Sequence, residues 1–408
     1  MTPFRIGLVV NPVAGLGGRV GLKGSDGVGV QERARALGAV PRAGARASAA
    51  LTELRARGVE FELLTAGGPM GVDGGRAVHS PTGDVTSAAD TVAAVRALRA
   101  AGAGLLLFAG GDGTARDVHD ALAPDGAEVP VLGIPTGVKM HSAVFAVNPR
   151  AAGEVAAAYV RDAGGVRLRR AEVMDRDEAA LREGRVTARL HGWLNVPHVP
   201  TRVQQRKTGS AVVDPEAVGG LAAELAERVA ELSPALSGAP PGRDCPSPDD
   251  AVRGRVVAGR AVPRAPSALV LGPGTTTQGI AAALGADVSP TGVSVLAVEG
   301  RSASVVAPDA TGDELLELAR ERAVLIALSP IGGQGFLLGR GNQQIGPELI
   351  RAVGAERLAL VASEAKLAAL GGRPLLLDSG DAALDAALSG YRPVLTGRGT
   401  CTMYRITT

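Results

Sequence analysis

Short apolar runs recur along the first 150 residues, and each one ends in a polar or glycine-rich stretch. Continuous runs of this kind are typical of parallel strands buried on both faces, whereas apolar positions three or four residues apart indicate amphipathic helices. The pattern predicts strands at 6–10, 59–65, 105–109 and within 129–142, and helices at 28–38, 46–57, 88–101 and 148–163. Alternation of strands with helices predicts a parallel sheet.

The pattern changes after residue 166. Three short, partly alternating segments predict strands without helices between them, at 166–173, 185–196 and 199–208. A helix is predicted at 216–232, and the stretch 233–266 is so rich in Pro, Gly, Ser and Arg that it indicates a flexible insertion without function. Strands and helices alternate again afterwards, with strands predicted at 268–271, 324–329, 358–362 and 374–377 and a helix at 280–284.

These elements predict an α/β protein with three parts. Residues 1–150 form a Rossmann-like domain with a parallel sheet that binds nucleotide or phosphate. Residues 151–320 form a β-rich substrate domain that contains the insertion, and residues 321–408 form a C-terminal α/β segment.

One strand end carries the most specific chemical signal. The apolar run 105–109 stops at a turn formed by Gly110, Gly111, Asp112, Gly113 and Thr114. Glycines let backbone N–H groups approach an anion, and the following helix directs its positive end to the same place. Asp112 is then placed to hold Mg²⁺ or to accept a proton from an attacking hydroxyl. The alternative is a tight turn in which Asp112 only caps the helix.

Further loops supply candidate binding groups. The strand end within 129–142 leads into Lys139, His141 and Ser142, and the glycine-rich loop 11–27 contains Asn11 and Lys23. Lysine otherwise occurs only at Lys207 and Lys366, while the remaining basic residues are arginine. A retained lysine can indicate a need for a compact ammonium group, which suits Lys23 and Lys139 in their glycine-rich loops. Lys366 is predicted to lie on a solvated helix face.

Two loops of the second half are also polar. The strand at 268–271 ends in a turn with three hydroxyls that suit phosphate or ribose, or that simply cap a helix: Thr275, Thr276 and Thr277. The segment 330–344 is rich in glycine and amides.

Composition excludes several classes of function. The net charge of +2 and the aromatic content of 2% argue against a nucleic-acid or membrane-surface partner. No apolar run is long enough for a membrane span, no signal-like segment precedes the first strand, and the cytoplasm is the expected location. The chain lacks P-loop, HExxH, GxSxG and protein-kinase signatures. The five histidines, His79, His119, His141, His191 and His198, show no metal-ligand spacing.

The motifs at 11–15, 110–114 and 272–277, taken in order, resemble those of the NAD kinase superfamily. The phrases at 20–27, 137–145 and 331–344 resemble a branch of predicted ATP- or polyphosphate-dependent NAD kinases that includes AcoX-like proteins. The resemblance implies a kinase that makes NADP from NAD with Mg²⁺ and ATP or polyphosphate, most commonly as a homo-oligomer.

The resemblance also assigns roles to residues. Asp112 matches the catalytic aspartate and is also a candidate ligand for Mg²⁺. Phosphate and nucleotide contacts are implied for Asn11, Lys23, Gly110, Gly111, Gly113, Thr114, Thr275, Thr276 and Thr277. Substrate contacts are implied for Lys139, His141, Ser142, Arg340, Asn342 and Gln343.

Two departures from the family pattern leave alternatives open. No tyrosine follows the threonines, and the Asn-Glu pair that holds the substrate ribose in ordinary NAD kinases has only candidate substitutes in Glu172, Asp175 and Asp177. The acceptor could therefore be another small hydroxyl metabolite. A non-catalytic regulator that binds nucleotide is the remaining alternative.

Overall fold

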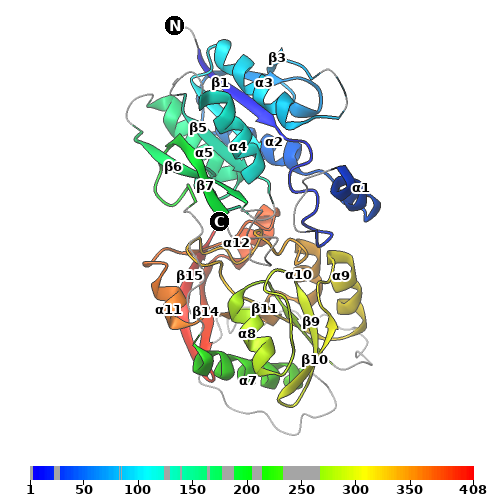
Figure 1. Cartoon of the computed structure of the whole chain (residues 1–408). Helices are drawn as coiled ribbons and strands as arrows, with labels where there is room; N and C mark the ends of the chain where they lie inside the picture. The colour runs from blue at the N-terminus through cyan, green and yellow to red at the C-terminus, as the bar shows by residue number, and fades with distance from the viewer. Residues whose placement is uncertain are drawn as a thin grey trace. The chain divides into compact units, whose positions relative to one another are not determined.

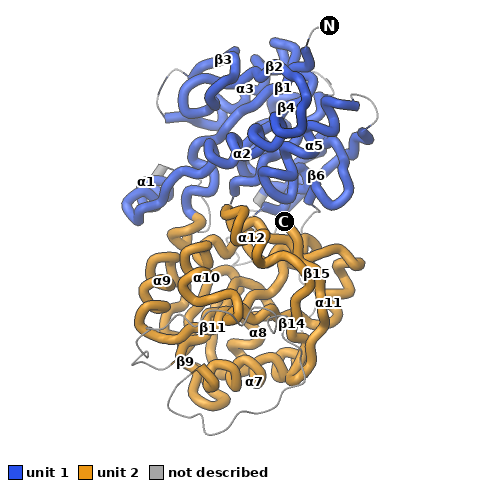
Figure 2. The backbone as a smooth tube through the Cα atoms, turned by 180° about the vertical axis from the view of Figure 1, so that it is seen from behind, with its two compact units in different colours: residues 1–17, 24–207 blue, residues 18–23, 208–408 orange. Residues whose placement is uncertain are grey.

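A computed structural model describes residues 3–22, 28–81, 83, 85–123, 129–137, 140–162, 166–176, 188–204, 214–232 and 267–408. The chain forms two compact units, which Figure 2 shows in blue and orange. The first consists of Met1–Gly17 and Gly24–Lys207, and the second of Gly18–Lys23 and Thr208–Thr408. The boundary between the two units lies after residue 207, whereas the sequence pattern predicted domain boundaries after residues 150 and 320. The predicted insertion at 233–266 lies outside the described residues.

The first unit contains the predicted parallel sheet (Figure 1). Its strand order is β3-β2-β1-β4-β5, and every neighbouring pair is parallel. The strands are β1 (Phe4–Val10), β2 (Phe61–Ala66), β3 (Arg76–His79), β4 (Leu105–Gly110) and β5 (Val131–Pro135). β4 is buried along its whole length, which explains why the sequence shows it as an uninterrupted apolar run.

The helices of the first unit pack in two pairs, α2 with α5 and α3 with α4. They are α1 (Val28–Ala36), α2 (Ala43–Ala56), α3 (Ala88–Ala100), α4 (Asp112–Leu122) and α5 (Pro149–Arg161), with a 3₁₀ turn η1 (Gly68–Met70). The chain leaves β1 through α2 toward one edge of the sheet and returns through α3 to β4 on the other side of β1. Right-handed crossovers in opposite directions place helices on opposite faces.

A two-stranded antiparallel ribbon also belongs to this unit. It consists of β6 (Leu168–Arg176) and β7 (Ala188–Pro197), and both strands pack against α4. This packing explains why the changeover comes at residue 207 and not near 150. The strand predicted at 199–208 was wrong over its described part, 199–204, where only Val203 forms an isolated bridge. Pro200 cannot donate to a strand ladder, and Thr201 adopts a φ of 65°.

The second unit contains an eight-stranded sheet in the order β10-β9-β8-β11-β12-β14-β15-β13. β8, β11, β12 and β14 are mutually parallel neighbours, and β9 and β15 run antiparallel to β8 and β14. The strands are β8 (Ala268–Leu271), β9 (Ser294–Glu299), β10 (Ser302–Ala307), β11 (Val324–Leu328), β12 (Leu358–Val361), β13 (Leu375–Leu376), β14 (Gly390–Gly397) and β15 (Thr400–Thr407).

Two apolar clusters cover the two faces of this sheet. Ala268 and Val270 of β8 belong to one cluster, and Leu269 and Leu271 belong to the other. The helices are α7 (Pro215–Glu231), α8 (Thr275–Ala283), α9 (Gly312–Glu321), α10 (Pro347–Val353), α11 (Glu364–Ala368) and α12 (Ala382–Leu388), with a 3₁₀ turn η4 (Ala355–Arg357). Residues 268–320, expected in a β-rich domain, therefore form part of an α/β layer structure.

The short segment Gly18–Lys23 is built into the second unit, although it precedes most of the first unit in sequence. The carbonyl of Arg19 accepts a hydrogen bond of 3.1 Å from the Gly312 N–H at the start of α9. The Arg19 guanidinium lies 3.7 Å from carboxylate oxygens of both Asp313 and Glu348. These contacts join the segment to α9 and α10.

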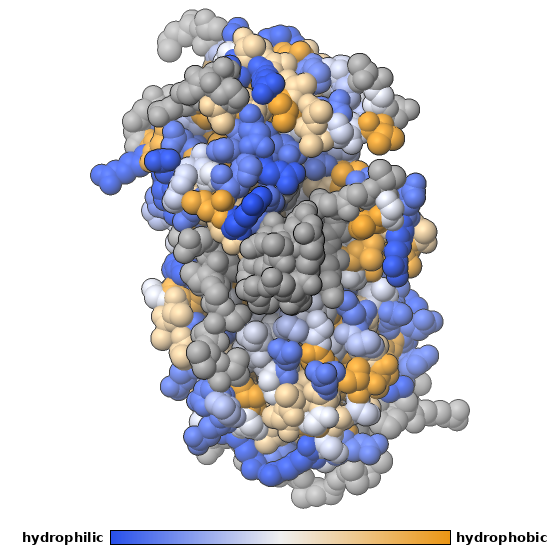
Figure 3. Space-filling model, in the orientation of Figure 1, coloured by the Kyte–Doolittle hydropathy of each residue, from blue (hydrophilic) through white to orange (hydrophobic). Residues whose placement is uncertain are grey.

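The visible surface carries no extended apolar area on its coloured residues. Figure 3 shows hydrophobic residues in small groups separated by hydrophilic ones. Among the described residues, no helix has the length and apolar character needed to cross a membrane.

Candidate functional site

The first candidate site lies where β1 and β4 end side by side. The chain moves away from these two neighbours in opposite directions, so their carboxyl ends form a topological switch point. Open α/β sheets bind ligands at such points because the diverging loops leave room between them. Asn11 directly follows β1, and the predicted glycine turn follows β4.

Asn11 joins the two loops. Its side-chain amide donates a hydrogen bond of 2.9 Å to the Thr114 hydroxyl, and its carbonyl oxygen accepts one of 3.2 Å from the Val13 N–H. The Asn11 backbone N–H donates to Ala109 O at 2.9 Å. The structure thus brings together two residues that the sequence proposed for phosphate binding.

Close backbone approach explains two of the glycines. A Cβ on Gly110 would lie 2.4 Å from Cβ of Thr114, and a Cβ on Gly111 would lie 3.2 Å from Cα of Gly137 in the loop after β5. The first contact leaves no space for a side chain, because the Thr114 Cβ cannot move away without its helix.

Asp112 is the first residue of α4, and Gly111 is the N-cap. Its carboxylate binds the loop after β5 instead of capping its own helix. Oδ2 accepts hydrogen bonds from the His141 N–H at 2.7 Å and faces His141 Nδ1 at 3.3 Å, while Oδ1 accepts from the Ser142 N–H at 3.0 Å and hydroxyl at 2.6 Å. The side chain is 16% exposed, so a ligand can reach it.

The loop that holds Asp112 is itself anchored to the β6–β7 ribbon. The Ser142 hydroxyl accepts a hydrogen bond of 2.9 Å from the Met174 N–H, and Ser142 O accepts one of 2.6 Å from the Gln204 side-chain amide. Gln204 is 2% exposed. Sequence analysis missed Gln204, because its hydrogen-bond partner Ser142 lies 62 residues away along the chain.

The carboxylate contacts bear on the choice between a metal ligand and a proton acceptor. A carboxylate offers about four lone-pair sites, and three donors bind the two oxygens of Asp112 while His141 Nδ1 faces Oδ2 at 3.3 Å. Either a magnesium ion or an acceptor hydroxyl would take the Oδ2 position that His141 Nδ1 now faces. Both roles of Asp112, metal ligand and proton acceptor, therefore stay predictions.

The second unit has a polar site of its own at the ends of β8, β11 and β12. These strands are parallel neighbours, so the residues after them lie along one sheet edge. α8 begins there at Thr275 after Gly274, and the Thr277 hydroxyl donates to Gly274 O at 2.9 Å. The threonines thus occupy the first turn of a helix, where backbone N–H groups point outward.

Lys366 completes this second site, and its predicted solvated position was wrong. The Lys366 ammonium donates hydrogen bonds to the Thr276 hydroxyl at 3.2 Å and to the Ser329 hydroxyl at 2.9 Å. A lysine ammonium beside hydroxyls at a positive helix end is an arrangement that suits a bound anion. The scarcity of lysine was used as a signal only for Lys23 and Lys139, although it could have applied to Lys366 too, and the helical pattern around Lys366 favoured a solvated position instead.

The predicted substrate residues of the loop 330–344 build the loop itself. Arg340 is 3% exposed, pairs with Asp378 at 2.5 Å and stacks over the Phe336 ring at 4.3 Å. Asn342 accepts from the Gly339 N–H at 3.0 Å and donates to Leu337 O at 2.7 Å, and the Gln343 amide donates to Gly339 O at 3.2 Å. Contact of these side chains with a substrate stays a prediction.

A second buried acid lies close in sequence to the Arg340–Asp378 pair. Burial raises the pKa of Asp385 to about 6, although hydrogen bonds from Ser379 act in the opposite direction. The nearby charges of Asp378 and Asp381 act in the same direction as burial and contribute to that value.

Two family models match the chain. The ATP-NAD kinase N-terminal domain matches residues 6–163, and the ATP-NAD kinase C-terminal domain matches residues 268–406. The chain belongs to the NAD kinase family. Among curated proteins, none matches the chain.

Membership of this family makes the protein a kinase. Each of the two candidate sites lies within one of the two matched ranges. Asn11, the 110–114 turn and Ser142 lie in the N-terminal match, and Thr276, Ser329 and Lys366 lie in the C-terminal match. The matches leave out residues 164–267, which include β6, β7 and Gln204.

The candidate substitutes for the family's ribose-binding pair lie in this unmatched part. Asp175 is placed 3.4 Å from Arg116 and 3.9 Å from Arg189, so its charge is balanced by arginines. Glu172 is partly buried on β6, and its backbone carbonyl accepts from the Ala143 N–H at 2.9 Å. Lys23, Lys139 and Asp177 lie outside the described residues.

Proposed function

We propose that this kinase transfers a phosphoryl group from ATP or polyphosphate to the 2′-hydroxyl of NAD and so produces NADP. The family membership supports the choice of nucleotide substrates. The observation that carries the proposal is the Asp112 carboxylate, which is held through both oxygens at the switch point of a parallel sheet.

Phosphoryl transfer asks the protein mainly to position the reactants and to balance charge. In the proposed mechanism the acceptor hydroxyl donates to Asp112 Oδ2 in place of the 3.3 Å contact with His141 Nδ1. The N–H groups of His141 and Ser142 keep the carboxylate oriented while the hydroxyl attacks the terminal phosphorus. Asp112 accepts the proton as the new O–P bond forms and the bond to the donor's leaving oxygen breaks. A bound Mg²⁺ would supply charge neutralisation at the donor's phosphates, and Asp112 is the candidate residue to hold it.

The glycine turn and Asn11 contribute phosphate contacts in this proposal. N–H groups at the start of α4 point away from the helix and can donate to phosphate oxygens. In the second unit, we assign phosphate binding to Thr276, Ser329 and Lys366, because an ammonium and two hydroxyls converge at the start of α8. The kinetic experiment in the next paragraph identifies which of the two substrates carries that phosphate.

Lys366→Met tests this second assignment. We expect KM for one of the two substrates to rise by ~10-fold, since a charged hydrogen bond to phosphate contributes roughly 1.5–3 kcal/mol. Lys366→Arg should recover part of the loss, because it keeps the charge but not the compact geometry. Steady-state kinetics with each substrate varied would measure this. An unchanged KM for both substrates in Lys366→Met would contradict the assignment.

The function itself is tested by NADP formation. Purified protein is incubated with NAD, Mg²⁺ and either ATP or polyphosphate, and NADP is measured with an NADP-specific dehydrogenase. Formation with one donor identifies that donor. If no NADP forms and the protein phosphorylates another small hydroxyl metabolite, that metabolite is the acceptor and NAD is not. Saturable nucleotide binding without turnover of any acceptor would favour a regulator. A cytoplasmic location and a homo-oligomeric state are further proposals that rest on the family.

A further inference from the structure

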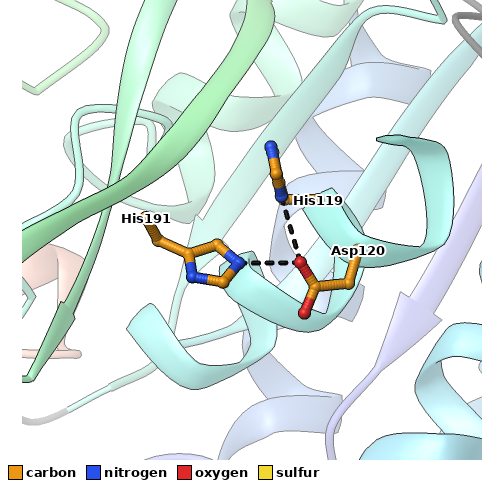
Figure 4. A group of neighbouring side chains, drawn as sticks. All are labelled: His119, Asp120 and His191. Atoms are coloured by element: carbon orange, nitrogen blue, oxygen red, sulfur yellow. Dashed lines mark hydrogen bonds and ion pairs between the residues drawn. The ribbon is translucent and has the colours of Figure 1, made fainter. Parts of the chain in front are cut away.

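Two histidines and an aspartate meet on the first unit, away from the contacts of Asp112. Figure 4 shows His119, Asp120 and His191 directed toward one another. The Asp120 carboxylate oxygen Oδ1 lies 3.1 Å from His119 Nδ1 and 2.7 Å from His191 Nε2. One nitrogen of each histidine and one carboxylate oxygen all lie within 4.8 Å of one another.

The fold builds this cluster from two different elements. His119 and Asp120 lie in the last turns of α4, and His191 lies on β7, which packs against that helix. The histidine rings contact edge to face, with centroids 5.1 Å apart. Gly192 makes the approach possible, because a Cβ there would lie 2.2 Å from His119 Nε2. The spacing of the histidines along the sequence could not show this cluster, since His191 lies 71 residues beyond Asp120.

We propose that His119, Asp120 and His191 bind one Zn²⁺ ion, with water as the fourth ligand. Zinc takes imidazole nitrogen and carboxylate oxygen at about 2.0–2.2 Å in a tetrahedron, which places neighbouring ligand atoms ~3.3 Å apart. The two separations to Asp120 Oδ1, 3.1 and 2.7 Å, need to open by about half an ångström or less to reach that value. The two histidine nitrogens lie within 4.8 Å of each other and would close on the ion as it binds.

Exposure of the cluster agrees with this assignment. The two histidine side chains are 21% and 23% exposed and that of Asp120 is 49% exposed, so an ion has a path from solvent and a water ligand has space. Without a metal, the same atoms are held by carboxylate–imidazole hydrogen bonds. Zinc would replace those bonds by stronger ones.

The consequence of zinc binding would be mechanical. The ion would fasten β7 to the end of α4, the helix that begins with Asp112. It would also hold the β6–β7 ribbon, to which Ser142 is anchored through Met174. The ion would thereby steady the Asp112 region, and this inference does not depend on which acceptor the kinase uses.

The test is a zinc titration of the full-length protein, purified without a histidine tag and stripped with a chelator. Isothermal titration calorimetry with Zn²⁺ should show one ion per chain. Removal of a direct ligand should weaken the affinity at least ~10-fold, because even loss of a residue that only orients a ligand has an effect of that size. We therefore expect this loss in His191→Gln and in Asp120→Asn.

His198→Gln is the matched control, because it makes the same chemical change just beyond β7 without touching the cluster. It should bind Zn²⁺ as the wild type does. Zn²⁺ should also raise the melting temperature of the wild type and raise that of Asp120→Asn by less at the same zinc concentration. Equal affinity in all four proteins, or no binding by a folded wild type, would overturn the proposal and leave only hydrogen bonds at this cluster.

Discussion

Asp112→Asn is expected to lower kcat for NADP formation at least ~100-fold, the usual size of a lost general-base contribution. Asparagine keeps the size of the side chain but cannot accept the hydroxyl proton. It also turns an NH₂ group toward the N–H groups of either His141 or Ser142, which now donate to the carboxylate at 2.7 and 3.0 Å. The measurement is steady-state NADP production at saturating substrates.

Because the substitution also disturbs the loop after β5, the control must separate catalysis from stability. Asp90→Asn makes the same change in the first turn of α3, where Asp90 accepts hydrogen bonds of 2.8 Å from the Ser87 N–H and hydroxyl. It should lower the melting temperature and leave kcat of the folded protein unchanged. Near-wild-type kcat in Asp112→Asn would refute the catalytic role. An equal loss of kcat in both variants would show that the loss in Asp112→Asn comes from lower stability and not from catalysis.

Arg340→Met is expected to destabilise the second unit by about 3–5 kcal/mol, because it leaves the Asp378 carboxylate in a buried place without its cation. The substitution also removes the cation from above the Phe336 ring, where it now lies 4.3 Å from the ring centroid. Urea unfolding with a fluorescence or circular dichroism signal would measure the change. KM of the fraction that stays folded should be close to that of the wild type if Arg340 only builds the loop.

Arg351→Met is a matched control for this prediction. Arg351 pairs with Asp381 at the same distance of 2.5 Å, but its side chain is 53% exposed. A surface pair contributes roughly 0–1 kcal/mol, so the control should change stability little. If the two variants lose equal stability, burial of the Arg340–Asp378 pair does not account for its contribution to the free energy of unfolding. A large rise in KM for Arg340→Met, without loss of stability, would restore the substrate contact implied by the family resemblance.

The elements that the sequence predicted are those whose signal is local. β1 and β4 are apolar runs that end in glycine or asparagine, and both were found within a residue or two of the predicted bounds. The turn at 110–114 was visible because glycines and a carboxylate are adjacent in sequence. The fold class was confirmed for the same reason, since alternating strands and helices imply a parallel sheet.

The features that sequence analysis missed depend on contacts between residues far apart in the chain. β14 and β15 form an antiparallel pair with polar and apolar positions mixed, and neither strand was predicted beforehand. Lys366 reaches Thr276 over 90 residues, and no periodicity within α11 could show that its ammonium turns inward. The ribbon β6–β7 was read as the start of a new domain, because sequence shows an element's type but not the helix it packs against.

The segment Gly18–Lys23 has a consequence for how this chain is made. It follows β1 closely, but its partners at Gly312, Asp313 and Glu348 are synthesised about 290–330 residues later. At a translation rate of roughly 5–20 residues per second, the Arg19 contacts must wait about 15–65 seconds after Arg19 itself is made. The first unit can assemble its sheet during that interval, whereas the second cannot be completed. Residues 208–408 expressed alone would lack this segment, so a fragment that folds fully should carry it as a separate peptide or a fused loop.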